Sequence, residues 1–130
     1  MRLLLDTHVA IWATNTPERI APQIRARLVG GIDVVAVSAA AIWEIAIKHA
    51  KGRRDAPPMT SLQAIDEFRT AGFDILDVTA AHAARVERLP SLHGDPFDRL
   101  MLAQAIVEDM QFVTYDRHLL RYGAPVLSWT

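Results

Sequence analysis

The chain has 130 residues, of which 51% are hydrophobic and 22% charged, and this length and balance predict one globular domain over residues 1–130. The 14 basic and 15 acidic residues give a formal net charge of -1, which disfavours a protein that coats nucleic acid but allows one that meets it at a single site. Because cysteine is absent, disulfides, thiolate zinc sites and cysteine nucleophiles are excluded. No apolar run approaches the ~18 residues that span a bilayer, and the start lacks a signal-peptide pattern, so we expect a cytoplasmic protein without membrane contact.

Strands and helices are predicted to alternate from the beginning of the chain. The run Leu3–Leu5 is short and apolar, which is typical of a strand buried on both faces. A helical pattern follows around residues 9–12, and a second helix is predicted over residues 17–29, before a pair of glycines. Residues 33–37 are mostly apolar and β-branched and predict the next strand.

A long helix is predicted over residues 39–51, with Ser38 at its N-cap and Gly52 at its end. Beyond a proline-rich loop, the same alternation continues. We predict helices over residues 61–70, 80–89 and 96–109, strands over 74–78, 111–115 and 126–129, and a short helical turn over 117–122. Strands that alternate with helices imply right-handed crossovers and a parallel sheet covered on both sides, which is an α/β fold.

Two acids come directly after predicted strands. Asp6 follows the first strand, and Asp116 follows the strand over residues 111–115. In open α/β sheets, ligands gather at the carboxyl ends of strands, especially where the strand order reverses, so these carboxylates would converge if their strands are neighbours. Aspartate is also a good helix N-cap, and that simpler interpretation stays open for each of them.

Glu44 lies in a stretch from Val34 to Ile47 that contains no other charge. It stands too far past Ser38 to cap the helix, and a carboxylate among apolar neighbours is costly unless a positive group meets it. That group is either an Arg or Lys side chain, which would make a structural ion pair, or a metal ion.

Asp95 and Asp98 lie at the start of the helix that begins at Pro96. Proline at the first helical position makes Asp95 the natural N-cap, and the helix dipole favours an acid at the position of Asp98. Capping alone would therefore explain both acids. The alternative is that Asp95 caps the helix while Asp98 points into a pocket shared with the other acids.

Four carboxylates that converge to ~3–5 Å repel one another unless a hard cation neutralises them. Oxygen ligands, with no cysteine and no paired histidines at helical spacing, suit Mg²⁺ or Mn²⁺ and not zinc. Such a centre chiefly supports the attack of water on a phosphodiester, because the metal lowers the pKa of the water and offsets charge on the phosphorus oxygens. The chain has no Walker loop or GxGxxG run, so nucleotide-dependent phosphoryl transfer lacks its phosphate cradle.

Four segments carry a resemblance to a known family. They are Leu3–His8, Val37–Glu44, the run Asp95–Arg99 with Ala103–Ala105, and Val113–Asp116. Together, in this order and near this spacing, they resemble the PIN-domain family and, within it, the VapC-type toxins. The resemblance covers nearly the whole chain.

The resemblance implies a three-layer α/β/α sandwich with a mostly parallel central sheet and an acidic pocket that binds Mg²⁺ or Mn²⁺. It implies a metal-dependent endoribonuclease that cleaves single-stranded or loop RNA as the toxin of a type II toxin–antitoxin pair. A cognate antitoxin protein would inhibit it, and the chain would associate as a homodimer.

The family's functional positions can be carried over residue by residue. Its three core acids fall on Asp6, Glu44 and Asp98, and its more variable fourth polar position falls on Asp116. The resemblance thus implies that these four residues are catalytic and bind the metal. Its hydroxyl positions near the pocket match Thr7, Ser38 and Thr114.

Other polar and aromatic residues have less specific interpretations. The densest basic stretch, formed by Lys48, Lys51, Arg53 and Arg54, either complements the negative end of a helix or forms a rim that contacts phosphates. The three tryptophans are predicted to anchor the core or an interface, because none sits among basic residues in the sequence. The resemblance gives no role to His8, His93 or Arg99, and for the two histidines and the arginine we expect capping or solvent-facing positions.

Three other functions compete with the ribonuclease. Structure-specific DNA nucleases have related metal sites, but this chain has no room for the elements that would hold a duplex. A response-regulator-like signalling domain also gathers acids around Mg²⁺, but it needs two adjacent acids after the first strand and a lysine near the end, and no lysine follows Lys51. In a non-catalytic interaction domain, the ordered set of acids would be accidental.

Overall fold

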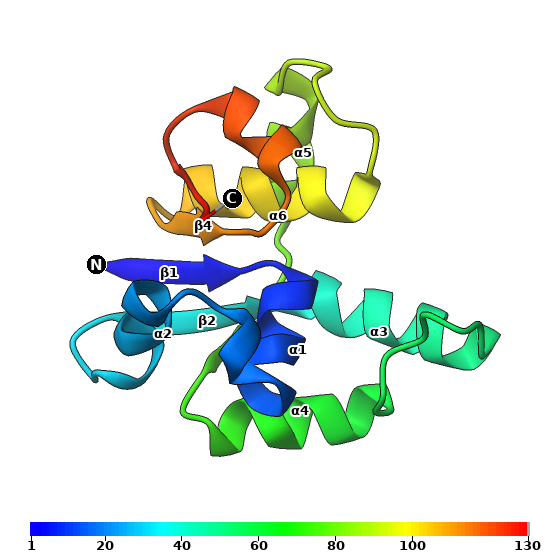
Figure 1. Cartoon of the computed structure of the whole chain (residues 1–130). Coiled ribbons are helices and arrows are strands. Elements are labelled where there is room, and N and C mark those ends of the chain that lie inside the picture. Colours follow the sequence, from blue (N-terminus) through cyan, green and yellow to red (C-terminus); the bar gives the residue numbers. More distant parts are fainter. Residues whose placement is uncertain (130) are drawn as a thin grey trace.

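The fold is described by a computed structural model over residues 1–129. A five-stranded, all-parallel sheet has the strand order β3-β2-β1-β4-β5. Helices α1, α2 and α4 lie on one face of it, and α5 and α6 lie on the other (Figure 1), so the predicted three-layer sandwich is confirmed. The strands are β1 (Arg2–Leu5), β2 (Val34–Ser38), β3 (Asp74–Leu76), β4 (Gln111–Val113) and β5 (Val126–Leu127).

The helices follow the strands in the order expected for right-handed crossovers. They are α1 (Thr7–Asn15), α2 (Pro22–Val29), α3 (Ala39–Lys51), α4 (Ser61–Thr70), α5 (Ala80–Arg85) and α6 (Pro96–Val107), with 3-10 segments η1 (Pro17–Arg19), η2 (Val86–Arg88) and η3 (Arg117–Tyr122). Within the described part of the chain, none of these helices has the length and apolarity needed to cross a bilayer.

The chain begins in the middle of the sheet. β1 pairs with β2 on one side and with β4 on the other. The chain first builds outward to β2 and β3, and then returns to add β4 and β5 beyond β1. The strand order therefore reverses between β1 and β4, and such a reversal opens a crevice at the carboxyl ends of the strands. Asp6 follows β1 at this point, and Thr114 follows β4.

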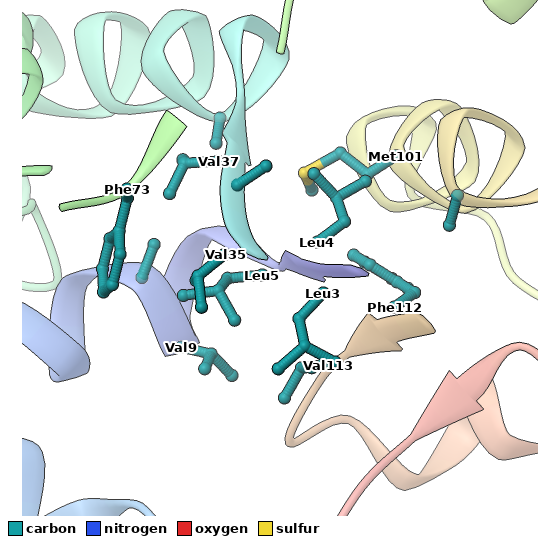
Figure 2. Packing of buried hydrophobic residues seen from close by; sticks show 14 of the residues in the cluster. Leu3, Leu4, Leu5, Val9, Val35, Val37, Phe73, Met101, Phe112 and Val113 are labelled. Atoms are coloured by element: carbon teal, nitrogen blue, oxygen red, sulfur yellow. The ribbon is translucent and has the colours of Figure 1, made fainter. Parts of the chain in front are cut away.

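The central strand is held by apolar contacts on both faces. Leu3, Leu4 and Leu5 are all 0% exposed, as the apolar run predicts. Figure 2 shows Leu4 directed toward Met101 of α6, and Leu5 toward Val9 of α1 on the other face. Each such side chain contributes ~1.5–3 kcal/mol when it is buried, so the segment that carries Asp6 has a rigid base.

The caps of α3 agree with the sequence prediction. The N–H of Ala40 donates to Oγ of Ser38 at 2.9 Å. At the other end, Gly52 adopts a φ of 62°, a left-handed conformation that glycine adopts without the steric cost of a Cβ. The predicted α4 is also found with the expected bounds, closed at its start by a capping box between Thr60 and Gln63.

The helix predicted over residues 17–29 is wrong in its first part. η1 ends at Arg19, and Ile20 and Ala21 are extended before α2 begins at Pro22. Proline has no N–H to donate, and its ring disfavours a helical conformation in the residue before it. Pro22 therefore starts a new helix instead of continuing the old one.

Several other elements are shorter than predicted. Strand β3 ends at Leu76, β4 at Val113 and β5 at Leu127, and the helix predicted over residues 80–89 becomes the 3-10 segment η2 after Arg85. The early end of β4 has a clear cause, because its neighbour β1 ends at Leu5, which is opposite Val113 in the ladder. Thr114 and Tyr115 are thus released from the β1 ladder and lie beside the crevice.

Candidate functional site

One pocket brings together all the acids that the sequence analysis singled out. It has a volume of about 390 Å³ and lies at the carboxyl ends of β1 and β4. The acids that line it are Asp6, Glu44, Asp95, Asp98 and Asp116, and the other lining residues are His8, Trp12, Lys48, His93 and Tyr115. The four acids implied by the resemblance therefore share one cavity, although they come from different elements of the fold.

Asp6 both caps a helix and lines the pocket. The N–H of Val9 donates to its Oδ1 at 2.8 Å, which caps α1, and the hydroxyl of Thr114 donates to its Oδ2. Asp6 is only 5% exposed, and this burial raises its pKa against the opposing effect of the two hydrogen bonds. The capping interpretation is thus correct, but it does not exclude a place in the site.

Glu44 has a lysine partner, which is one of the two alternatives for its burial. Nζ of Lys48, one turn further along α3, lies 2.5 Å from Oε2 of Glu44. The hydroxyl of Thr7 donates to Oε1 at 2.6 Å. Burial by itself would lower the pKa of Lys48, but the hydrogen bond and charge of Glu44 outweigh it, so that pKa is raised. Lys48 is therefore a cation within the pocket and not only a charge at the end of α3.

Asp95 and Asp98 have different positions at the start of α6. Oδ1 of Asp95 accepts the N–H groups of Phe97 and Asp98 at 2.8 and 3.1 Å, so Asp95 is the N-cap. The pKa of Asp98 is raised from 3.8 to about 8. Burial is the main cause, followed by the negative charges of the four other acids of the pocket.

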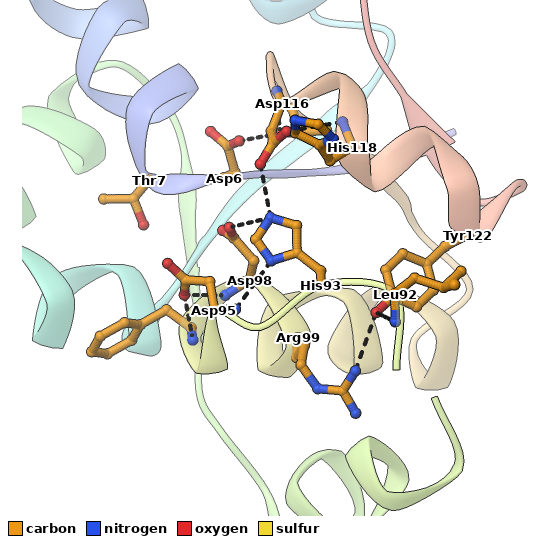
Figure 3. A network of polar contacts seen from close by, with 12 residues as sticks. Asp6, Thr7, Leu92, His93, Asp95, Asp98, Arg99, Asp116, His118 and Tyr122 are labelled. Atoms are coloured by element: carbon orange, nitrogen blue, oxygen red, sulfur yellow. Dashed lines mark hydrogen bonds and ion pairs between the residues drawn. The ribbon is translucent and has the colours of Figure 1, made fainter. Parts of the chain in front are cut away.

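Asp116 is held by a histidine that the sequence analysis left without a role. Nε2 of His93 lies 2.8 Å from Oδ2 of Asp116 and 3.8 Å from Oδ2 of Asp98. Figure 3 shows His93 between these two carboxylates, which come from different elements. Burial alone would raise the pKa of Asp116, but the hydrogen bonds from His93 and from the backbone N–H of His118 lower it.

The position of the proton on His93 follows from its second nitrogen. The backbone N–H of Asp95 donates to Nδ1 at 3.1 Å, so Nδ1 must be unprotonated and the proton of the neutral ring is on Nε2. Nε2 can then donate to Asp116 but has no lone pair for a metal. The ring thus acts as a hydrogen-bond donor that orients the carboxylate.

The donor set of the pocket fits a hard cation. Carboxylate oxygens of Asp98 and Asp116 lie within 4.8 Å of each other, and Asp6 and Glu44 line the same cavity. Oxygen donors of this kind suit Mg²⁺ or Mn²⁺. Five acids and one lysine line the pocket, and the charges of the other acids add to burial in raising the pKa of Asp98.

The remaining sequence predictions divide between the pocket and its surroundings. Thr7 and Thr114 contact Glu44 and Asp6 respectively, whereas Ser38 is fully buried as the cap of α3. Arg99 points away from the pocket (Figure 3), where its guanidinium donates to the carbonyl of Pro90 and to the hydroxyl of Tyr122 at 3.0 and 3.1 Å.

The sequence analysis missed the aromatic part of the pocket. Trp12 was predicted to anchor the core or an interface because it has no basic neighbours in the sequence, but in the fold the guanidinium carbon of Arg19 lies 4.2 Å from the centroid of its ring. Tyr115 and His8 also line the cavity. The signal for Tyr115 was its position next to Asp116, whereas the contact between Arg19 and Trp12 depends on the turn made by η1.

The raised pKa of Asp98 predicts how stability depends on pH in the absence of metal. Between pH 4 and 8 the folded chain keeps a proton that the unfolded chain releases, so the free energy of unfolding falls as the pH rises through this range. Asp98→Asn should flatten this fall by on the order of 1–3 kcal/mol in urea unfolding with EDTA. Asp66→Asn, a change at an exposed position of α4, should keep the original slope. If the free energy of unfolding depends on pH in the same way for the unsubstituted chain and for Asp98→Asn, Asp98 does not keep a proton in the folded chain.

The cap and the pocket acid can also be separated by stability. Asp95→Ala removes the acceptor of two backbone N–H groups and should lower the free energy of unfolding by ~0.5–2 kcal/mol. The measurement is best made at pH 6, because Asp98 is then protonated and gains little from the loss of a neighbouring charge. Asp98→Ala leaves both cap bonds in place and is the matched control. An unchanged urea midpoint for Asp95→Ala would show that the cap contributes nothing.

The comparisons with known proteins agree with this fold. The solved structure of VapBC2 from Rickettsia felis bound to a promoter DNA fragment contains a chain with a TM-score of 0.72 and 17% identity, and the match covers 100% of both chains. A chain of DNA-bound VapBC from Salmonella typhimurium gives a TM-score of 0.70 at 17% identity and covers 100% of this chain and 99% of that one. At this level of identity, the two likenesses concern the fold.

Comparisons of the sequence identify the family as well as the fold. The chain is 35% identical over 133 aligned positions to Ribonuclease VapC22 of Mycobacterium tuberculosis, and the match covers 98% of each protein. The family model of the PIN domain matches residues 3–125, which include all five acids of the pocket. The chain therefore belongs to the PIN-domain family.

Proposed function

We propose that the chain is a metal-dependent endoribonuclease and the toxin of a toxin–antitoxin pair, which acts in the cytoplasm and associates as a homodimer. The observation that carries the proposal is the convergence of five acids in one pocket, where burial and the four other carboxylates raise the pKa of Asp98 to about 8. Such a pocket favours binding of a divalent cation. The 35% identical relative named a ribonuclease supports RNA as the substrate.

Asp6, Glu44, Asp98 and Asp116 are the residues that would hold the ion. Bound there, Mg²⁺ or Mn²⁺ would lower the pKa of a water and offset negative charge on the phosphodiester oxygens. Asp95 lines the same pocket, but its Oδ1 is engaged in capping α6. We therefore assign it a structural role.

The chain itself supplies fixed positions for these carboxylates. The hydroxyls of Thr7 and Thr114 hold Glu44 and Asp6, and His93 holds Asp116. The ammonium of Lys48, which pairs with Glu44, adds a positive charge to the pocket that could also contact a phosphate oxygen. Preorganised groups of this kind need no rearrangement when the phosphodiester becomes more negative during the reaction.

Replacement of the pocket acids should remove catalysis. Asp6→Asn, Glu44→Gln and Asp98→Asn should abolish Mg²⁺-dependent cleavage of single-stranded RNA while the chain stays folded, because each removes a charge that holds the ion. Asp95→Ala should lose less activity per folded molecule than these three variants, and Asp66→Asn should keep full activity. The readout is RNA fragmentation on gels, with EDTA as the metal-free control.

Two outcomes would overturn this proposal. Full Mg²⁺-dependent cleavage by Asp98→Asn would remove the metal site from the mechanism. Cleavage of DNA of the same sequence with no cleavage of RNA would favour the DNA nuclease instead.

The proposal includes a protein inhibitor, because an active ribonuclease with a preformed pocket would harm its own cell. An apolar hollow of about 520 Å³ lies among α1, η1, α2 and the segment after α4, and its lining includes Ile20, Leu28, Val29 and Phe73. It suits the apolar face of a partner helix. The apolar hollow and the acidic pocket share no lining residue, so another part of the partner would present an Arg to the acids, whose carboxylates its planar guanidinium binds well. The VapBC complexes among the structural relatives support such a partner.

The partner proposal can be tested in cells. Expression of the chain alone should arrest growth, and co-expression of the neighbouring gene should restore it. Val29→Asp places a charge in the apolar hollow at a position that is 81% exposed, so it should keep the arrest but abolish the rescue. Leu62→Asp, at a position of α4 that is 74% exposed, should retain both. Normal growth during strong expression of folded parent protein would count against a toxin.

A further inference from the structure

Three aromatic rings form a wall beside the acidic pocket. The ring centroids of Trp12 and Tyr115 are 5.4 Å apart, and those of Tyr115 and Trp129 are 5.2 Å apart. Trp12 and Trp129 also meet, at 6.3 Å. We call these three residues the aromatic wall. Trp12 and Tyr115 line the same cavity as the acids, so the wall belongs to the surface that a substrate would meet.

Tyr115 is the exposed member of the aromatic wall. Its side chain remains 47% exposed although it packs against two tryptophans. Both of its chain neighbours are bound into the site, since Thr114 donates to Asp6 and Asp116 is bonded to His93. The backbone of Tyr115 is therefore fixed relative to the acids, and its ring is presented at a constant place next to them.

Cations continue from the aromatic wall along the surface. A second hollow of about 260 Å³ shares His8, Trp12 and Lys48 with the acidic pocket and extends to Arg19 and the loop at residues 55–58. The guanidinium of Arg19 lies over the ring of Trp12. Within residues 1–129 it makes no ion pair or side-chain hydrogen bond. Its donors are free to bind a phosphate, and Asp55 is the acid that this hollow contains.

We propose that the aromatic wall is a nucleobase subsite, in which Tyr115 stacks on a base of single-stranded RNA next to the scissile phosphodiester while Arg19 binds a neighbouring phosphate. This inference rests on the proposed function, because the acidic pocket must hold the phosphodiester. Single-stranded nucleic acids are bound elsewhere by the same combination of aromatic faces and cations along the backbone. The guanidinium of Arg19 already covers a face of Trp12, so the exposed ring of Tyr115 is the one that receives the base.

The subsite accounts for features that packing alone does not require. An aromatic cluster that only stabilised the fold would bury its rings, but Tyr115 is half-exposed at the rim of the cavity. A cation that only stabilised η1 would pair with an acid, whereas Arg19 lies on the aromatic wall. Stacking tolerates any base, so the subsite sets where the strand lies and favours the bases that stack best.

The test measures binding separately from cleavage. The full chain carrying Asp98→Asn binds a fluorescein-labelled single-stranded RNA decamer of mixed sequence with Mg²⁺, and the Kd is read by anisotropy. Adding Tyr115→Leu should weaken binding about tenfold, since one stacked base contributes ~1–3 kcal/mol. Tyr115→Phe keeps the ring and should stay within about twofold of the Asp98→Asn parent. Arg19→Gln should weaken binding and reduce its salt dependence, whereas Arg25→Gln, in α2 and outside both hollows, should not.

An abasic decamer of the same length supplies the decisive comparison. If Tyr115 stacks on a base, Tyr115→Leu should change the Kd of the abasic strand by less than about twofold. An equal loss for both strands would show that Tyr115 acts through the fold and would overturn the subsite, as would no loss for either strand. Weaker binding of the antitoxin with unchanged RNA binding would assign the aromatic wall to the protein partner instead. If the chain without any substitution fails to cut RNA while base-dependent binding is intact, the proposed ribonuclease is overturned and the subsite is not.

Discussion

Mutual repulsion among buried carboxylates is the constraint on which the rest of the site depends. The sheet brings Asp6 and Asp116 to one crevice, α3 adds Glu44, and α6 adds Asp98. Hydrogen bonds hold Asp6, Glu44 and Asp116 in place, so none of these three can turn away to solvent without losing one. The chain relieves part of this charge through Lys48 and a proton retained on Asp98. A bound divalent cation would relieve the remainder, and the fold would supply the rigidity that keeps the acids together.

Carboxylates that repel one another need a rigid support, and the buried core beneath the pocket supplies it. Leu3–Leu5 are completely buried between two layers of helices, and the segment after them carries the first acid. Thr114 joins the carboxyl ends of β1 and β4, because its hydroxyl donates to Asp6 and accepts the N–H of Asp116. Part of the free energy that stabilises the sheet therefore offsets the repulsion between like charges held at close range. Such repulsion is a common feature of functional sites.

Local signals in the sequence predicted the parts of the fold that depend on neighbours in the chain. Proline after Asp95 identified a cap, glycine after Lys51 identified the end of α3, and the apolar run Leu3–Leu5 identified the central strand. The break at Pro22 was also a local signal, because proline disfavours a helical conformation in the residue before it. Helical spacing places Lys48 one turn after Glu44, so this ion pair could have been predicted from the sequence.

Contacts between distant residues were beyond such reasoning. His93 meets Asp116 across 23 positions of the chain, and its proton is placed by the backbone of Asp95. The aromatic wall joins residues near both ends of the chain, which approach only because β1 and β4 are neighbours. Neither arrangement leaves a periodic signal. The acids were found from local signals in the sequence: Asp6 and Asp116 follow predicted strands, Glu44 lies among apolar residues, and Asp98 lies in the first turn of a predicted helix.

The central claim is that the acidic pocket binds a divalent cation in place of a proton. Calorimetric titration of Mn²⁺ at pH 7, repeated in buffers of different ionisation enthalpy, counts the protons released on binding. Because Asp98 has a pKa of about 8 in the metal-free chain, the account predicts release of about one proton for each ion bound, and none from Asp98→Asn. Binding to the parent chain without proton release, or equal binding and release by Asp98→Asn, would contradict it.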